Sequence, residues 1–243
     1  MMKGLGYSAL SAIGVVVGGL LIVMHTGDPH HPRRRKVLAS LIGFGGGFML
    51  SVAMLEMLPA SFELNGGPIA VLIGYLLVHL TQHMLTPHFH FGEETHPEAM
   101  VSRNIGVWAL VGLLPHSFLD GVAISSGFLT SDRLGMLTFG AIVLHKVPEG
   151  VSLASVMVAS GNDSRTTLSA VSGIAFATVL GALVTPAVAV LSEYGLALSA
   201  GVTIYVAASN LIPESQHERG LMIPGCVFLG VLAFYLARLL LPV

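Results

Sequence analysis

The sequence contains a single cysteine, Cys226, among its 243 residues. One cysteine excludes a disulfide within the chain, and it excludes a metal centre built from several thiolates. A metal ion held by this chain would therefore be ligated by histidine, carboxylate, methionine or serine side chains.

Charge is also scarce, because Asp, Glu, Lys and Arg make up only 10% of the residues and leave a net charge of −2. A nucleic-acid surface needs an excess of basic residues to neutralise phosphates, so nucleic acid is excluded as a partner. Hydrophobic residues reach 53%, and the mean hydropathy is +0.81. This composition leaves too little polar surface to cover a soluble globule, so we expect an integral membrane protein whose solvent is the lipid bilayer.

Eight apolar stretches are long enough to cross a hydrocarbon core of about 30 Å. They lie near residues 4–24, 37–60, 67–86, 105–128, 134–159, 167–192, 195–213 and 221–241, with a tight turn at 192–195 between the sixth and the seventh. Lys3 precedes the first stretch as in a signal peptide, but its length and the absence of a cleavage motif favour a retained helix. We expect an all-α membrane protein in which residues 1–243 form one transmembrane domain, a bundle of eight helices, with no evident repeat.

The basic residues of the connecting segments predict the orientation of this bundle. Seven of these residues lie on one side of the membrane, namely Arg33, Arg34, Arg35, Lys36, Arg103, Arg165 and Arg219. The other side has three, namely Lys3, Arg133 and Arg238. Positive charge is retained in the cytosol during insertion, so both termini are expected to be extracytoplasmic. The expected location is the cell membrane, plasma or inner.

The fourth and fifth stretches share one pattern, His-x-x-x-carboxylate-Gly. It places His116 with Asp120 in the fourth stretch and His145 with Glu149 in the fifth. Residues four apart lie on one face of a helix, so each stretch offers an imidazole and a carboxylate one turn apart. If the two faces meet, their four ligands match the charge of a divalent ion, with Zn²⁺ first and Fe²⁺, Mn²⁺ or Cd²⁺ as alternatives.

The same residues could instead pair with one another as polar contacts between helices, His116 with Asp120 or Glu149 with Lys146. Ionisable groups at the centre of a bilayer cost about 3 kcal/mol each on insertion scales. Because five such groups occur in two adjacent spans, we favour a functional site over a structural one.

With eight spans, extracytoplasmic termini and the paired motifs, the chain resembles the ZIP (Zrt/Irt-like protein) family of metal transporters over essentially its whole length. The resemblance implies metal uptake toward the cytoplasm, with spans one, four, five and six moving as a unit against the other four. It also implies a homodimer. It identifies His116, Asp120, His145 and Glu149 as ligands of the first metal site.

Some members of that family hold a second ion with an Asn, an Asp and a Glu. In this sequence the three positions are occupied by Ser117, Lys146 and Thr178. The Lys146 ammonium supplies about the charge of a second cation and would repel one nearby. We therefore expect one bound metal ion and not two.

Further polar residues lie toward the ends of the spans. Glu56 in the second span could attract entering cations, or it could simply reach water from a helix end. Asn210 and Glu214 flank Pro213 in the seventh span, where they could line the inner exit or cap a helix.

Histidines accumulate in the third span and in the cytoplasmic loop 87–104 that follows it. They could collect metal, or they could be merely solvated; they are His79, His83, His88, His90 and His96, and the first cytoplasmic loop adds His25, His30 and His31.

Two rival functions use the same residues. An intramembrane zinc-dependent hydrolase could activate water at a histidine and carboxylate site with an open position. The His-Glu-x-x-His string that a protease of this type needs does not occur in the sequence. A proton-conducting or metal-sensing receptor is the other rival, and we favour a transporter that is not an enzyme.

Overall fold

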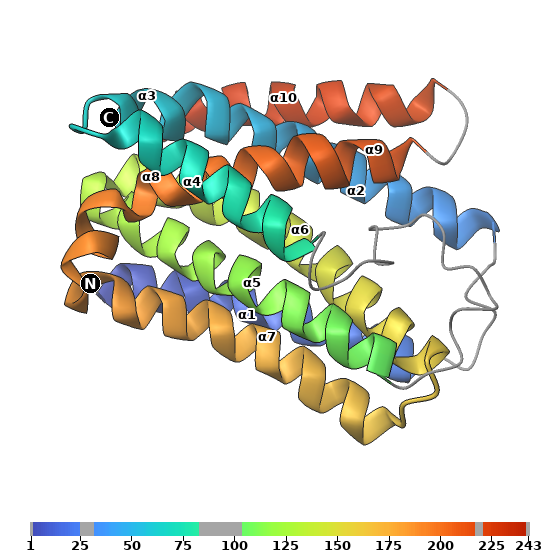
Figure 1. The fold of residues 1–243 in the computed structure, drawn as a ribbon. Helices are drawn as coiled ribbons and strands as arrows, with labels where there is room; N and C mark the ends of the chain where they lie inside the picture. The colour runs from blue at the N-terminus through green and yellow to red at the C-terminus, as the bar shows by residue number, and fades with distance from the viewer. Residues whose placement is uncertain (1, 25–31, 83–103, 217–220, 242–243) are drawn as a thin grey trace.

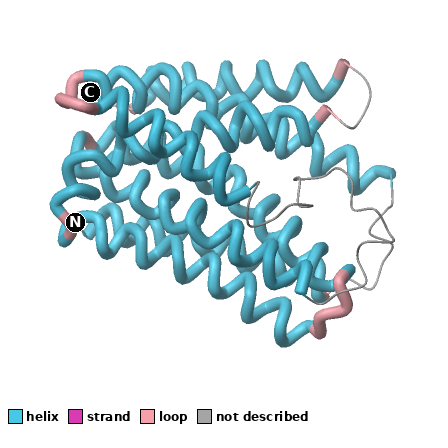
Figure 2. The backbone as a smooth tube through the Cα atoms, in the orientation of Figure 1, coloured by secondary structure: helices cyan, strands magenta, loops and turns pink. Residues whose placement is uncertain are grey.

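The computed structural model describes residues 2–24, 32–82, 104–216 and 221–241. These residues form helices joined by short connections, and no strand occurs among them (Figure 2). The elements are α1 (Met2–Val23), α2 (Pro32–Val52), η1 (Ala53–Met57), α3 (Leu58–Phe62), α4 (Gly67–Leu80), α5 (Asn104–Thr130), α6 (Asp132–Ala159), α7 (Ser164–Val184), η3 (Thr185–Ala187), α8 (Ala189–Tyr205), η4 (Val206–Leu211), α9 (Ile212–Ser215) and α10 (Met222–Leu240).

All eight expected helices are present, and in the described part of the chain seven are long and apolar enough to cross a membrane. The remaining one is α4, which covers 14 residues and is followed by Thr81 and Gln82 at the edge of the described residues. α1 begins and α10 ends at the same end of the bundle, which we call the terminal end (Figure 1). The prediction of an all-α membrane protein is confirmed.

The connection between the sixth and seventh helices differs from the predicted one. α7 leads into η3 and α8 begins at Ala189, so the turn expected at 192–195 lies inside α8 and that prediction was wrong. Pro186 has no backbone N–H and restricts the residue before it, which ends the helix there. Gly195 serves packing instead, because a Cβ at this position would lie 2.5 Å from the Ser126 hydroxyl of α5.

The long helices group into two units (Figure 1). In the first unit α1, α5, α6 and α7 pack on one another. In the second unit α10 packs on α2, α4 packs on α8, and α2 meets the continuation of α8 through η4 and α9. One apolar core lies inside the first unit, and a larger one fills the second unit and its boundary with the first. Contacts between the units come mainly from α5 with α8 and from α2 with α6.

Glycines allow very close approach between α1 and α6. Gly18 lies against the Val147 carbonyl, and Gly150 lies against the Val15 carbonyl, so a Cβ at either glycine would clash with backbone. The two helices are therefore held in one register by their main chains.

The same contact is repeated between α7 and α5. Gly181 lies against the Phe118 carbonyl, and Gly121 lies against the Thr178 carbonyl. The spacing of the four residues matches that of the α1 and α6 contact, so α7 corresponds to α1 and α5 corresponds to α6. In this correspondence the histidine and carboxylate of one motif match those of the other.

The second unit contains its own repeated pair of glycine contacts. Each glycine lies against a backbone carbonyl of the partner helix: Gly47 against Val227 and Gly230 against Phe44 in α2 and α10, and Gly201 against Val71 and Gly74 against Leu198 in α8 and α4. α8 thus corresponds to α2, and α10 to α4. This internal repeat was not predicted, and its signal in the sequence is the spacing of the glycines.

The second and seventh spans also share a widened turn. η1 and η4 are π-helical, with the Leu58 N–H bonded to the Ala53 carbonyl and the Ile212 N–H bonded to the Ala207 carbonyl. A proline lies two residues after the end of each turn, at Pro59 and Pro213, and its ring would clash with the carbonyl four residues earlier in a regular helix. The widened turns relieve that clash.

Candidate metal centre

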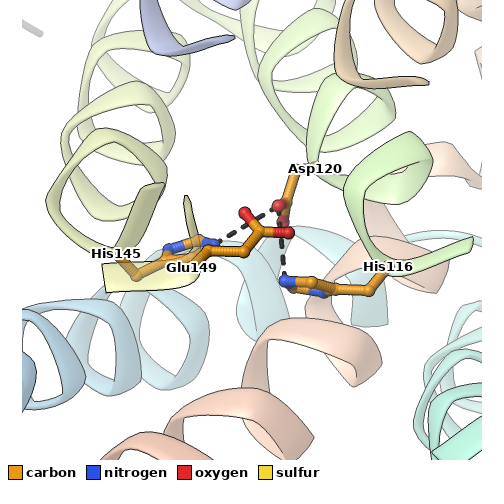
Figure 3. A group of neighbouring side chains, drawn as sticks. All are labelled: His116, Asp120, His145 and Glu149. Atoms are coloured by element: carbon orange, nitrogen blue, oxygen red, sulfur yellow. Dashed lines mark hydrogen bonds and ion pairs between the residues drawn. The ribbon is translucent and has the colours of Figure 1, made fainter. Parts of the chain in front are cut away.

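The paired motifs meet between α5 and α6. His116 and Asp120 extend from α5, His145 and Glu149 extend from α6, and the four side chains point toward one another (Figure 3). Each residue is at most 3% exposed. One ligand atom from each side chain can be chosen so that all four atoms lie within 4.8 Å of one another. The predicted convergence of the two helix faces is therefore observed.

Local sequence explains how the two helices hold this geometry. α5 continues through Pro115 and α6 continues through Pro148. Since neither proline can donate a backbone hydrogen bond, each helix lacks one regular helical hydrogen bond at its proline. Gly121 and Gly150 follow the carboxylates directly, and they allow α7 and α1 to approach the two motif helices closely.

Asp120 lies between the two imidazoles. Its Oδ2 atom is 3.4 Å from Nε2 of His116 and 3.3 Å from Nε2 of His145 (Figure 3). The ring centroids of the two histidines are 5.6 Å apart. Both Nε2 atoms thus face the same small volume as a carboxylate oxygen, which is the donor set that a divalent transition metal accepts.

The backbone orients His145 for this role. Its Nδ1 atom lies 3.2 Å from the Ala141 carbonyl oxygen. A carbonyl can only accept, so Nδ1 carries the proton of this contact and Nε2 is the ring nitrogen that faces the site. Nδ1 of His116 is also buried, and the described residues offer it no hydrogen-bond partner.

Lys146 and Ser117 complete the cluster. The Lys146 ammonium is 2.7 Å from Oδ2 of Asp120 and 2.6 Å from Oε2 of Glu149. The Ser117 hydroxyl donates to Oε1 of Glu149 over 2.5 Å. The pair of Lys146 with Glu149 was foreseen as the structural alternative, whereas the pair with Asp120 across the helices was missed. The flexible stem of lysine allows that reach, and no spacing rule predicts it.

Thr178 stands apart from this cluster. It is buried on α7, and its hydroxyl donates to the Ile174 carbonyl of its own helix over 3.2 Å. Its own carbonyl lies against Gly121. The sequence position that would supply a carboxylate to a second ion therefore offers the site no ligand side chain.

Glu56 binds two arginines near the terminal end of the bundle. In η1, its Oε1 atom is 3.3 Å from Nη2 of Arg133 and 2.7 Å from Nε of Arg238. Only 16% of the side chain is exposed, so Glu56 is held by ion pairs and does not simply reach water. Neither partner could be predicted from the sequence, because both lie far from Glu56 along the chain.

Asn210 occupies the corresponding place in η4. Its amide donates to the Gln82 side chain over 3.2 Å. It lies inside a helical turn, so the expectation that Asn210 caps a helix was wrong. Asn210 matches Glu56 in the internal repeat, and Gln82 matches Arg238. Glu214 lies in the short helix α9 that follows.

Among the histidines outside the motifs, His79 is described. It lies on α4, with its ring 5.8 Å from the ring of Tyr205 and nearly perpendicular to it. The other histidines considered for metal collection lie outside the described residues, namely His25, His30, His31, His83, His88, His90 and His96.

The sequence of this chain also matches that of known proteins. The family profile described as ZIP Zinc transporter matches residues 87–238, which is more than half of the chain. This segment contains both motifs. The resemblance inferred from the sequence is thereby confirmed, and the hydrolase alternative finds no support.

Individual relatives are also named as zinc transporters. Zinc transporter YKE4 of Saccharomyces cerevisiae is 23% identical over 248 residues, covering 87% of this chain and 71% of its own. Zinc transporter SLC39A7 of Canis lupus familiaris is 32% identical over 149 residues, covering 55% of this chain and 30% of its own. Zinc transporter ZIP13 of Rattus norvegicus is 29% identical over 131 residues, covering 49% of this chain and 35% of its own. The chain thus matches about a third of the length of these mammalian relatives, and it belongs to the ZIP zinc transporter family.

Proposed function

We propose that this chain transports a divalent transition metal ion across a membrane, with Zn²⁺ as its principal substrate. The observation that carries the proposal is the convergence of His116, Asp120, His145 and Glu149 at one buried point between two membrane-spanning helices. Buried ionisable groups within a membrane are expensive, and they mark ion pathways when they cluster. The relatives are named zinc transporters, which supports zinc as the ion.

The donor set fits this ion. Two imidazole nitrogens and two carboxylate oxygens can surround Zn²⁺ tetrahedrally, and their two negative charges balance it. Fe²⁺, Mn²⁺ and Cd²⁺ accept the same atoms, so they are the competitors to test first. We propose a single ion per chain, because Lys146 lies where a second cation would face both carboxylates.

The proposed direction of transport is toward the cytoplasm. The distribution of Lys and Arg supports termini outside the cell, in a plasma or inner membrane. We propose that the first unit moves against the second, because each unit has its own closely packed helices and the metal centre lies within the first. The assembly proposed from the family is a homodimer.

Polar groups near the two ends of the second unit suggest the remainder of the route. Glu56 lies near the terminal end, where a carboxylate would attract a cation once its arginine partners move away. Asn210 and Glu214 lie in the corresponding span toward the opposite end, and we propose that they line the exit. His79 and the histidines of loop 87–104 would collect metal on the cytoplasmic side.

The proposal is tested with purified protein in proteoliposomes. Elemental analysis of the protein should give one zinc per chain, and ⁶⁵Zn²⁺ uptake should saturate with concentration. Unlabelled Zn²⁺, Cd²⁺, Fe²⁺ and Mn²⁺ are then added as competitors to rank the ions. Vesicles that bind zinc but never accumulate it in the lumen would refute transport.

A further inference from the structure

The Lys146 side chain is completely buried at the metal centre. Its ammonium contacts Oδ2 of Asp120 at 2.7 Å, Oε2 of Glu149 at 2.6 Å and the Ser117 hydroxyl at 3.5 Å. An ammonium has three N–H donors, and it finds three acceptors here. One lysine therefore bridges the two carboxylates that would ligate the ion.

The internal repeat makes this lysine unusual. His145 matches His116, Glu149 matches Asp120, and Lys146 matches Ser117. The two halves thus contribute equivalent metal ligands, while only one half contributes a cation. Since the Ser117 half reaches the same backbone packing around Gly121 without a lysine, close packing of these helices does not require an ammonium.

Lys146 changes the net charge of the site when no metal is bound. Two carboxylates with neutral imidazoles would place two uncompensated negative charges inside the membrane. The ammonium reduces the net charge of the site to one negative charge, and it pairs with both carboxylates. Buried charges are tolerated when they are paired and hydrogen-bonded, and they are strongly unfavourable when they are not. In the metal-free site of this chain, both carboxylates are therefore paired with the same internal cation.

Building on the proposed transport function, we propose that Lys146 is the built-in counter-ion of the empty carrier. After releasing its metal, a carrier must return the empty site to the other side of the membrane. A site with two unpaired carboxylates would return only with a replacement cation bound, which gives obligatory exchange. With Lys146 paired to both carboxylates, the empty site returns alone, so net transport follows the metal gradient without coupling to a second ion.

Two transport assays in proteoliposomes separate the empty return step from the loaded step. Exchange is measured as ⁶⁵Zn²⁺ entering vesicles that hold the same concentration of unlabelled zinc, and it needs only the loaded carrier. Net uptake is measured into zinc-free vesicles that contain a chelator, and it needs the empty carrier to return. Potassium and valinomycin on both sides hold the membrane potential at zero in both assays.

The informative variant is Lys146→Met, which keeps the approximate length of the side chain and removes its charge. We expect the ratio of net uptake to exchange to fall about tenfold or more, since a tenfold rate change corresponds to a modest rise in one barrier. The matched control is Lys3→Met, which removes a lysine that is paired with Asp132 far from the site and should leave this ratio unchanged. An unchanged ratio in Lys146→Met, or an equal loss of both activities, would overturn the proposal.

A measurement on the unmodified protein decides the question even if the variant does not fold. Net zinc uptake should continue at the same rate in the presence of a protonophore, and a pH dye in the lumen should report no proton release coupled to zinc. Net uptake that stops without an exchangeable proton or metal in the lumen overturns the counter-ion role. If the unmodified protein shows neither exchange nor net uptake, the proposed transport function itself has failed.

Discussion

Glu56 of η1 and Arg133 of α6 belong to different four-helix units, and their side chains form an ion pair with 3.3 Å between Oε1 and Nη2. The second partner of Glu56 is Arg238 of α10, which lies in the same unit as Glu56, at 2.7 Å. One carboxylate thus takes part in a contact between units and in a contact within a unit. Only the pair with Arg133 must change if the units move relative to each other.

Cross-linking across the units should stop transport. We expect that Glu56→Cys combined with Arg133→Cys, in a Cys226→Ser background, takes up zinc until a short bifunctional thiosulfonate reagent joins the two cysteines. Uptake should then stop, because the units are tied together near the terminal end. A reducing agent should restore it.

The matched control joins the same cysteine to its other neighbour. Cross-linking of Glu56→Cys with Arg238→Cys connects two helices of one unit, so it should change uptake little relative to the same variant before the reagent is added. Equal inhibition in both pairs would mean that the two units do not move as separate bodies.

Loss of one imidazole should disable the metal centre. We expect His145→Ala to bind zinc about 100-fold more weakly or worse, because removing even an outer-shell partner of a metal ligand costs 10- to 100-fold. Saturable uptake should disappear while the helix content by circular dichroism stays unchanged. Undiminished saturable uptake by this variant would show that the ion crosses elsewhere.

The convergence of the metal centre could be predicted because its information is local. Four-residue spacing places His116 with Asp120, and His145 with Glu149, on single helix faces, and the short connection between α5 and α6 makes the two helices neighbours. The contact of Lys146 with Asp120 could not be predicted in this way. It depends on how the two helices are rotated and on which conformation a flexible side chain adopts.

Contacts between residues far apart in the sequence could not be predicted from local spacing either. Arg133 and Arg238 meet Glu56 only through the packing of three helices, so nothing near Glu56 in the sequence indicates them. The misplaced turn between the sixth and seventh helices has a related cause. Glycine is typical of turns, but Gly195 serves close packing against α5, and the break between the helices occurs at Pro186.

The number of bound ions should depend on Lys146. We expect Lys146→Asp to bind more than one zinc per chain, because it replaces a cation at the centre with an additional carboxylate ligand. Elemental analysis of purified protein measures the change. The matched control is Ser117→Asp at the corresponding position of the other half, which adds the same carboxylate but keeps the ammonium. This variant should still bind one zinc ion per chain. A zinc content of one ion per chain in Lys146→Asp would contradict our account of this lysine.

Close packing next to the metal centre should be intolerant of a single methyl group. In Gly150→Ala the new Cβ would meet the Val15 carbonyl and the Gly19 backbone nitrogen of α1, so α1 and α6 must separate. Overpacking of this kind costs about 1–3 kcal/mol. We expect a lower unfolding temperature and weaker zinc binding, since Glu149 moves with its neighbour.

Gly225→Ala on α10 is the matched control, because a Cβ there meets nothing within 4 Å and alanine favours a helix by about 1 kcal/mol. Thermal unfolding followed by circular dichroism in detergent compares the two, and equal unfolding temperatures would show that the α1 and α6 backbones are not in contact.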